Sequence, residues 1–133
     1  MLLAIRTFLL AEFGFYFFHR WWSHTFPFSL HRRHHEGRGA MADEVSGTIA
    51  MCLAHLFGPL RVNVTVYYTY TVALIAVHKL THLENVPRLL RFHSAYHRLH
   101  HDDPTTNYAI VTPLMDLLFK TARFPPRRSS FRR

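Results

Sequence analysis

Histidines at metal-ligand spacing are the main chemical feature of this sequence. Ten of its 12 histidines fall in four short boxes with the patterns HxxxxH, HxxHH, HxxxH and HxxHH. They are His19 and His24; His31, His34 and His35; His78 and His82; and His97, His100 and His101. Neutral imidazole is the commonest metal ligand in proteins and suits Fe, Zn, Cu and Ni. The boxes therefore predict a metal site.

The spacing within three boxes is helical. Residues at i, i+3 and i+4 share one face of an α-helix, which is the spacing of both HxxHH boxes and of His78 and His82. His19 and His24 are five residues apart, a rotation of about 140° on an ideal helix. That pair requires a helix end, a π-bulge or a loop between its members.

The number of histidines favours two metals. Ten protonated imidazoles would repel one another, whereas neutral imidazoles around two cations, about five per metal, are chemically reasonable. A histidine-rich tract that binds metal loosely is the alternative, but boxes at helical spacing on both sides of an apolar stretch argue against it. We interpret His55 as structural and His93 as at most a support for a ligand.

Apolar segments must position these boxes. Residues 1–18 lack the basic start and the cleavage site of a signal peptide, so we predict a retained membrane helix. Arg6 and Glu12 within it should face protein or a cavity. Residues 41–77, broken at Gly58-Pro59, predict a helical hairpin that returns the chain to the face it left. A soluble buried hairpin is the alternative, and "TVYYTYTV" also has strand-like composition.

Charge indicates the orientation. Of the 16 Lys and Arg residues only Arg6 and Arg61 lie outside the histidine-bearing segments, so the positive-inside rule places the histidines on the cytoplasmic side. The predicted fold class is all-α: integral membrane helices with a cytoplasmic histidine-rich helical cap, in one domain (1–133) that ends in a basic tail (123–133).

We predict no nucleic-acid partner, because the net charge of +8 is not arranged as a Lys/Arg stripe. The single Cys52 excludes a disulfide framework.

Three stretches resemble the fatty acid hydroxylase/sterol desaturase superfamily of integral-membrane di-iron enzymes. They are "EFGFYFFHRWWSH", "LHRRHHE" and "HKLTHLENVPRLLRFHSAYHRLHHDDPTTNYAIVTPLMDLLFKT". The similarity runs roughly from Glu12 to Thr121. Met115 and Lys120 stand where the family usually has Trp and Gly, and family members are usually longer, with more helices before the first box.

The resemblance implies a ligand set and its supports. The ten boxed histidines would hold two Fe ions, for which Zn could substitute in purified protein. Four further residues are candidates to orient the imidazoles: Asp102, Asp103, Asn107 and Asp116. The alternative for Asp102-Asp103-Pro104 is a helix stop and turn. Asp116 could instead be a helix N-cap or an ion-pair partner.

The activity that the resemblance implies is O2-dependent oxidation of a lipid C–H bond. Hydroxylation of a fatty acyl or related lipid is favoured; a sterol or carotenoid hydroxylase or desaturase is the alternative. No flavin, haem or iron–sulfur motif is visible, so a cytochrome b5-type or ferredoxin-type donor is expected. The membrane would be a bacterial inner membrane or the endoplasmic reticulum. Phe15, Phe18 and Phe26 could line the path of a lipid from the membrane, and Trp21 and Trp22 suit an interfacial belt.

Two other functions stay open. A non-catalytic metal-binding membrane subunit of the same fold would explain the small size, and a homo-oligomer could complete the bilayer part. Retention of all ten ligand positions favours the enzyme. A soluble zinc-binding helical protein is the weaker alternative.

Overall fold

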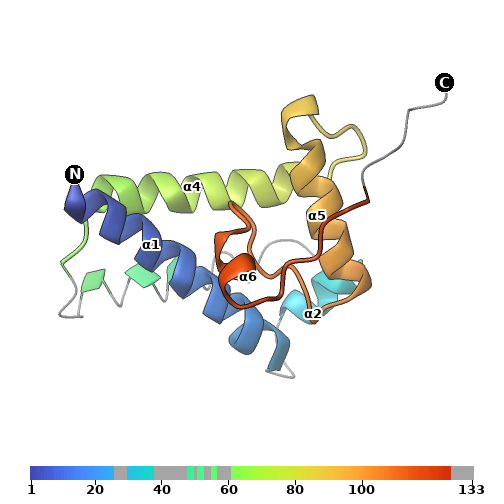
Figure 1. Ribbon diagram of the computed structural model, residues 1–133, viewed down its shortest axis with the longest axis horizontal. Helices are drawn as coiled ribbons and strands as arrows, with labels where there is room; N and C mark the ends of the chain where they lie inside the picture. Colours follow the sequence, from blue (N-terminus) through green and yellow to red (C-terminus); the bar gives the residue numbers. More distant parts are fainter. Residues whose placement is uncertain (26–29, 38–47, 50, 53–54, 57–60, 127–133) are drawn as a thin grey trace.

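The described part of the protein is entirely helical. The computed structural model describes residues 1–25, 30–37, 48–49, 51–52, 55–56 and 61–126, and no strand occurs in these ranges. This agrees with the predicted all-α class. The elements are α1 (Leu2–Phe17), the π-helix η1 (Phe18–Ser23), α2 (Leu30–His35), α4 (Val64–Thr81), the 3-10 helix η2 (Arg88–Leu90), α5 (Arg91–Asp102) and α6 (Leu114–Leu118) (Figure 1).

α1 and η1 form one continuous apolar helix. It runs from Leu2 to Ser23, 22 residues, and its most apolar 18-residue stretch has a mean hydropathy of 1.3. Crossing a bilayer takes about 20 apolar residues. Of the helices in the described ranges, this one is long and apolar enough to cross a membrane. It overlaps the predicted segment 1–18 and continues into the first histidine box.

α4 lies beside α1, and both helices start at the same end of the molecule (Figure 1). The strand-like stretch "TVYYTYTV" is helical here. Asn63 caps the helix, its Oδ1 accepting the Val66 N–H at 3.1 Å. Tyr67, Tyr70 and Leu74 then recur at helical spacing and pack against α1. Most of the first arm of the predicted 41–77 hairpin, and its turn at Gly58-Pro59, lie outside the described residues.

Polar contacts fasten the two helices where they start. The Thr7 hydroxyl accepts the Asn63 N–H at 2.8 Å. The exposed Arg6 guanidinium donates to the Arg61 carbonyl, so this arginine does contact protein as predicted. The two arginines that fall outside the histidine-bearing segments are therefore neighbours at one end of the pair.

The histidines lie at the opposite end. There α5 packs across the end of α4, and the Ser94 hydroxyl donates to the Thr81 carbonyl at 2.8 Å. α6 and the loop before it pack on α1 through Tyr16, Tyr108 and Met115. Three long elements, α1–η1, α4 and α5, thus converge on one region.

Candidate metal centre

The first box is brought into register by a π-helical turn. In a π-helix each N–H bonds to the carbonyl five residues back, so residues five apart lie on one face. η1 spans Phe18–Ser23, and the rings of His19 and His24 stack with centroids 5.2 Å apart. Of the three solutions that the spacing allowed, the π-helix is the one found. π-helical turns occur frequently at functional sites.

The ten boxed histidines form two groups of five. In each group, one ring nitrogen from every member lies within 4.8 Å of all the others. Centre A consists of His19, His24, His31, His35 and His100; centre B consists of His34, His78, His82, His97 and His101. The two centres adjoin, and the rings of His35 and His101 stack between them at 4.2 Å. The expected count of about five imidazoles per metal matches this geometry.

Each HxxHH box places two histidines in one centre and its third histidine in the other centre. His31 and His35, one turn apart on α2, enter centre A, while His34 enters centre B. On α5 the pattern is reversed: His97 and His101 enter centre B and His100 enters centre A. Identical spacing in the two boxes therefore follows from a reciprocal arrangement, in which each helix supplies a same-face pair to one centre and a single ligand to the other.

The nitrogen spacings suit a metal ion with many ligands. In centre A the Nε2 atoms of His31 lie 2.9 Å from those of His19 and His35. In centre B the Nε2 atom of His97 lies 2.9 Å from that of His78 and 3.1 Å from that of His101. Two nitrogens each about 2.1 Å from one metal and at right angles are about 3.0 Å apart, whereas tetrahedral ligands are about 3.4 Å apart. The groups could thus hold five- or six-coordinate metals.

Backbone carbonyls fix the orientation of two ligands. His19 Nδ1–H donates to the Tyr108 carbonyl at 2.5 Å, and His100 Nδ1–H donates to the Thr106 carbonyl at 2.7 Å. Because a carbonyl can only accept, Nδ1 must carry the proton in each ring, and the Nε2 lone pair faces centre A. Metal-binding histidines typically have such a partner on the other nitrogen. These residues therefore fit a bound cation.

Burial keeps the imidazoles neutral. Desolvation lowers the pKa of His24 and His35 to about 4 and that of His101 to about 3. The pKa values of His97 and His100 are also held well below the ordinary range, first by burial and then by the neighbouring imidazoles. At neutral pH the site offers uncharged nitrogen donors, the form that binds metal.

Asp116 is linked to centre A through the backbone and not by direct contact. Its fully buried carboxylate accepts the backbone N–H groups of Tyr108 and Ala109 at 2.9 and 2.8 Å. It also accepts the hydroxyls of Tyr96 and Thr121 at 2.9 and 2.7 Å. It thereby holds the Tyr108 peptide whose carbonyl accepts from His19. The hydrogen bonds from Asp116 to the His19 ring thus run through the backbone, which side-chain types in the sequence could not reveal.

Of the other three candidate supports, Asp103 and Asn107 bind the surrounding chain. Asp102 is exposed at the end of α5. The Asp103 side chain accepts from the Thr105 N–H and forms an ion pair with Arg123 at 2.9 Å, as expected of the turn alternative. Asn107 is fully buried, adopts a positive φ of 53°, and its amide donates to the Tyr96 and Arg123 carbonyls. It joins α5 to the segment after α6.

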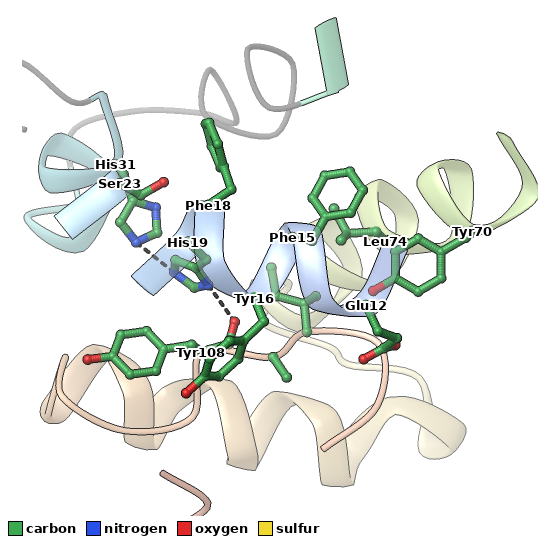
Figure 2. Close-up of a pocket in the computed structure, with 12 residues that line it drawn as sticks. Glu12, Phe15, Tyr16, Phe18, His19, Ser23, His31, Tyr70, Leu74 and Tyr108 are labelled. Carbon is green, nitrogen blue, oxygen red and sulfur yellow. Dashed lines mark hydrogen bonds between the residues drawn. The ribbon is translucent and has the colours of Figure 1, made fainter. Parts of the chain in front are cut away.

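A small, largely apolar cavity borders centre A (Figure 2). Its volume is about 30 Å³, and its lining includes His19 and His31 together with Phe15, Phe18 and Leu74. Glu12 also lines it and is 2% exposed, so its predicted position facing a cavity is confirmed.

Of the remaining sequence candidates, those that the structure describes neither line this cavity nor belong to either centre. Trp21 and Trp22 are about half exposed, as suits an interfacial belt. His93 bonds to the Val111 carbonyl and belongs to neither centre. The ring of His55 stacks on that of Tyr67, with centroids 6.2 Å apart. Phe26 is outside the described residues.

Comparison with known proteins identifies one family. The family model described as fatty acid hydroxylase matches residues 4–121, which include all ten histidines of the two centres. No curated protein and no solved structure matches the chain.

The metal-free protein should lose stability as the pH falls below about 6.5, the ordinary histidine pKa. Folded-state pKa values near 4 for His24 and His35 mean that the unfolded chain binds more protons between these limits. The free energy of unfolding is therefore highest above this window and decreases with decreasing pH. Denaturant unfolding in detergent measures it. Replacing both residues with Gln should flatten the profile; an equally steep profile would contradict the assignment.

Two double variants, each lacking two histidines, should distinguish the two centres by their affinity for metal. His34→Ala with His101→Ala leaves three ligands in centre B and five in centre A. We expect one metal to be lost to a chelator and the other to be held as tightly as in the parent. His34→Ala with His35→Ala leaves four ligands in each centre, so two metals of equal, intermediate affinity are expected. Identical chelator titrations for the two variants would contradict the grouping.

Proposed function

The chain belongs to the fatty acid hydroxylase family, and we propose that it is a membrane-bound, O2-dependent lipid oxidoreductase that carries two iron ions. The observation that carries the proposal is the pair of five-histidine centres at one end of an apolar helix. When bound, two redox-active metal ions would supply the oxidation of an unactivated C–H bond, which acid–base side chains cannot perform. Zn would occupy the same nitrogens without redox chemistry.

The cavity beside centre A suits the reacting part of an alkyl chain. Phe15, Phe18 and Leu74 present apolar surface next to His19 and His31. A cavity of about 30 Å³ admits one or two methylene-sized groups rather than a whole chain. These side chains would therefore place one short stretch of the lipid at centre A and exclude water from it.

The favoured reaction is hydroxylation of a fatty acyl or related lipid. The family description supports this choice, and the apolar lining of the cavity suits an alkyl group. Hydroxylation and desaturation both begin with removal of a hydrogen, so a sterol or carotenoid hydroxylase or desaturase is the second candidate.

The proposed orientation places the histidine end in the cytoplasm. Arg6 and Arg61 meet at the opposite end of the helix pair, whereas 14 of the 16 Lys and Arg residues belong to the histidine-bearing segments. The positive-inside rule then favours a cytoplasmic metal site, in a bacterial inner membrane or the endoplasmic reticulum. An external one-electron donor on that side would supply the reducing equivalents.

Lipid mass spectrometry tests the proposal. Cells in air would express the parent, His100→Ala or His93→Gln, each with a matched redox donor. A lipid that gains one oxygen should appear with the parent and with His93→Gln, and should fall at least tenfold with His100→Ala, which removes a ligand of centre A. Loss of two hydrogens would instead indicate desaturation. Matching lipid profiles from parent and His100→Ala, both inserted in the membrane, would refute the catalytic function.

A further inference from the structure

A second, larger hollow lies away from the residues that line the first cavity. It is a groove of about 760 Å³ along α5, between the loop that follows α4 and the segment that follows α6. Figure 1 shows these two segments flanking α5. Its lining residues are Glu84, Asn85, Val86, Arg91, Phe92, Ser94, Ala95, Arg98, Pro125 and Pro126. None of the ten histidines lines it.

The groove runs along α5, which carries histidines of both centres, and the exposed histidine of centre B lies near it in the sequence. His82, the exposed member of centre B, precedes the lining residue Glu84 by two positions. On the other wall Arg98 directly follows His97, a buried member of the same centre. The substrate-sized cavity, in contrast, touches His19 and His31 of centre A. An apolar cavity therefore borders centre A, whereas the exposed histidine of centre B lies two residues from the lining of the groove.

The chemistry of the groove suits an acidic protein. Arg91 and Arg98 are both exposed and lie seven residues apart, so they share one face of α5 about 10 Å from each other. Phe92, which also lines the groove, stacks on Phe124, and the two side chains are 44% and 50% exposed. Arginine and exposed aromatic residues are enriched in protein interfaces. The only acidic residue among the lining residues is Glu84.

We infer that this groove is the docking site of the electron donor, an acidic one-electron carrier protein whose electrons enter the dinuclear site through centre B. This inference rests on the proposed function. Oxidation of a lipid RH follows RH + O2 + 2 e⁻ + 2 H⁺ → ROH + H2O, so two reduced carriers are each oxidised by one electron per turnover. Opposite charge on the partner would steer its encounter with the groove and raise the association rate.

Single charge reversals test the site. Arg91→Glu and Arg98→Glu change the groove, whereas Lys120→Glu makes the same change at an exposed position near α6 that does not line it. The probe is the soluble haem domain of a cytochrome b5, added to the full-length, iron-loaded protein in detergent. Binding is measured by isothermal titration and haem oxidation by stopped flow, at about 0.05 M and about 0.5 M salt, which span weak and strong screening.

We expect each groove variant to bind the haem domain and accept its electrons about tenfold more slowly at low salt, with a weaker salt dependence. Lys120→Glu should behave as the parent. Parent-like binding and reduction by both groove variants, or no binding of the haem domain by the parent, would overturn the inference. Selective loss of binding to vesicles containing anionic lipid, with donor binding retained, would also overturn it and indicate a membrane-facing groove.

A chemical reductant separates this inference from the proposed function. Reduction with a stoichiometric amount of dithionite in the absence of O2, followed by mixing with O2 at high salt, should give one turnover of lipid oxidation equally in the parent and in both groove variants, because dithionite does not need the docking site. If dithionite yields no oxidised lipid even with the parent, while haem-domain binding still depends on Arg91 and Arg98, the proposed function fails and the docking site stands.

Discussion

The structure depends on bringing five uncharged imidazole nitrogens to each of two neighbouring points. A protonated histidine cannot bind metal, and burying its charge beside nine other histidines costs free energy. Burial meets both requirements, because it removes water from the rings and favours their neutral form. Each ring must then reach its point from a helix of fixed pitch. The π-turn of η1, the i, i+4 pairs and the exchange between α2 and α5 are the consequences of that constraint.

Much of the site could be predicted from the sequence because imidazole spacing follows helix geometry. The ten histidines, the same-face pairs and the need for an irregular turn between His19 and His24 were all visible in the residue pattern. Two metals with about five imidazoles each were also expected from the count, but the membership of each group was not visible, because it depends on how α2 and α5 face each other. The partners of His19 and His100 were also hidden, since backbone carbonyls carry no signal in residue type.

The fold was harder to predict from the sequence than the site was. Asn63 and the recurrence of Tyr67, Tyr70 and Leu74 make α4 a helix, although its β-branched and tyrosine-rich start resembles a strand. The end of the first apolar helix was placed at residue 18, but the helix continues to Ser23 because the π-turn keeps the backbone hydrogen-bonded through the first box. The buried position of Asp116 was also hidden, because its carboxylate accepts the hydroxyl of Tyr96, which lies 20 residues earlier on α5.

The two centres differ in their surroundings. Centre A touches an apolar cavity, whereas centre B includes an exposed histidine two residues from the lining of the groove along α5. X-ray absorption spectroscopy of the iron-loaded protein, on a sample whose iron content per chain is quantified, tests the central claim most directly. The account predicts two metals per chain, each with about five imidazole nitrogens at about 2.1 Å and no sulfur ligand. A single metal per chain, or a shell of three or fewer imidazoles, would contradict it.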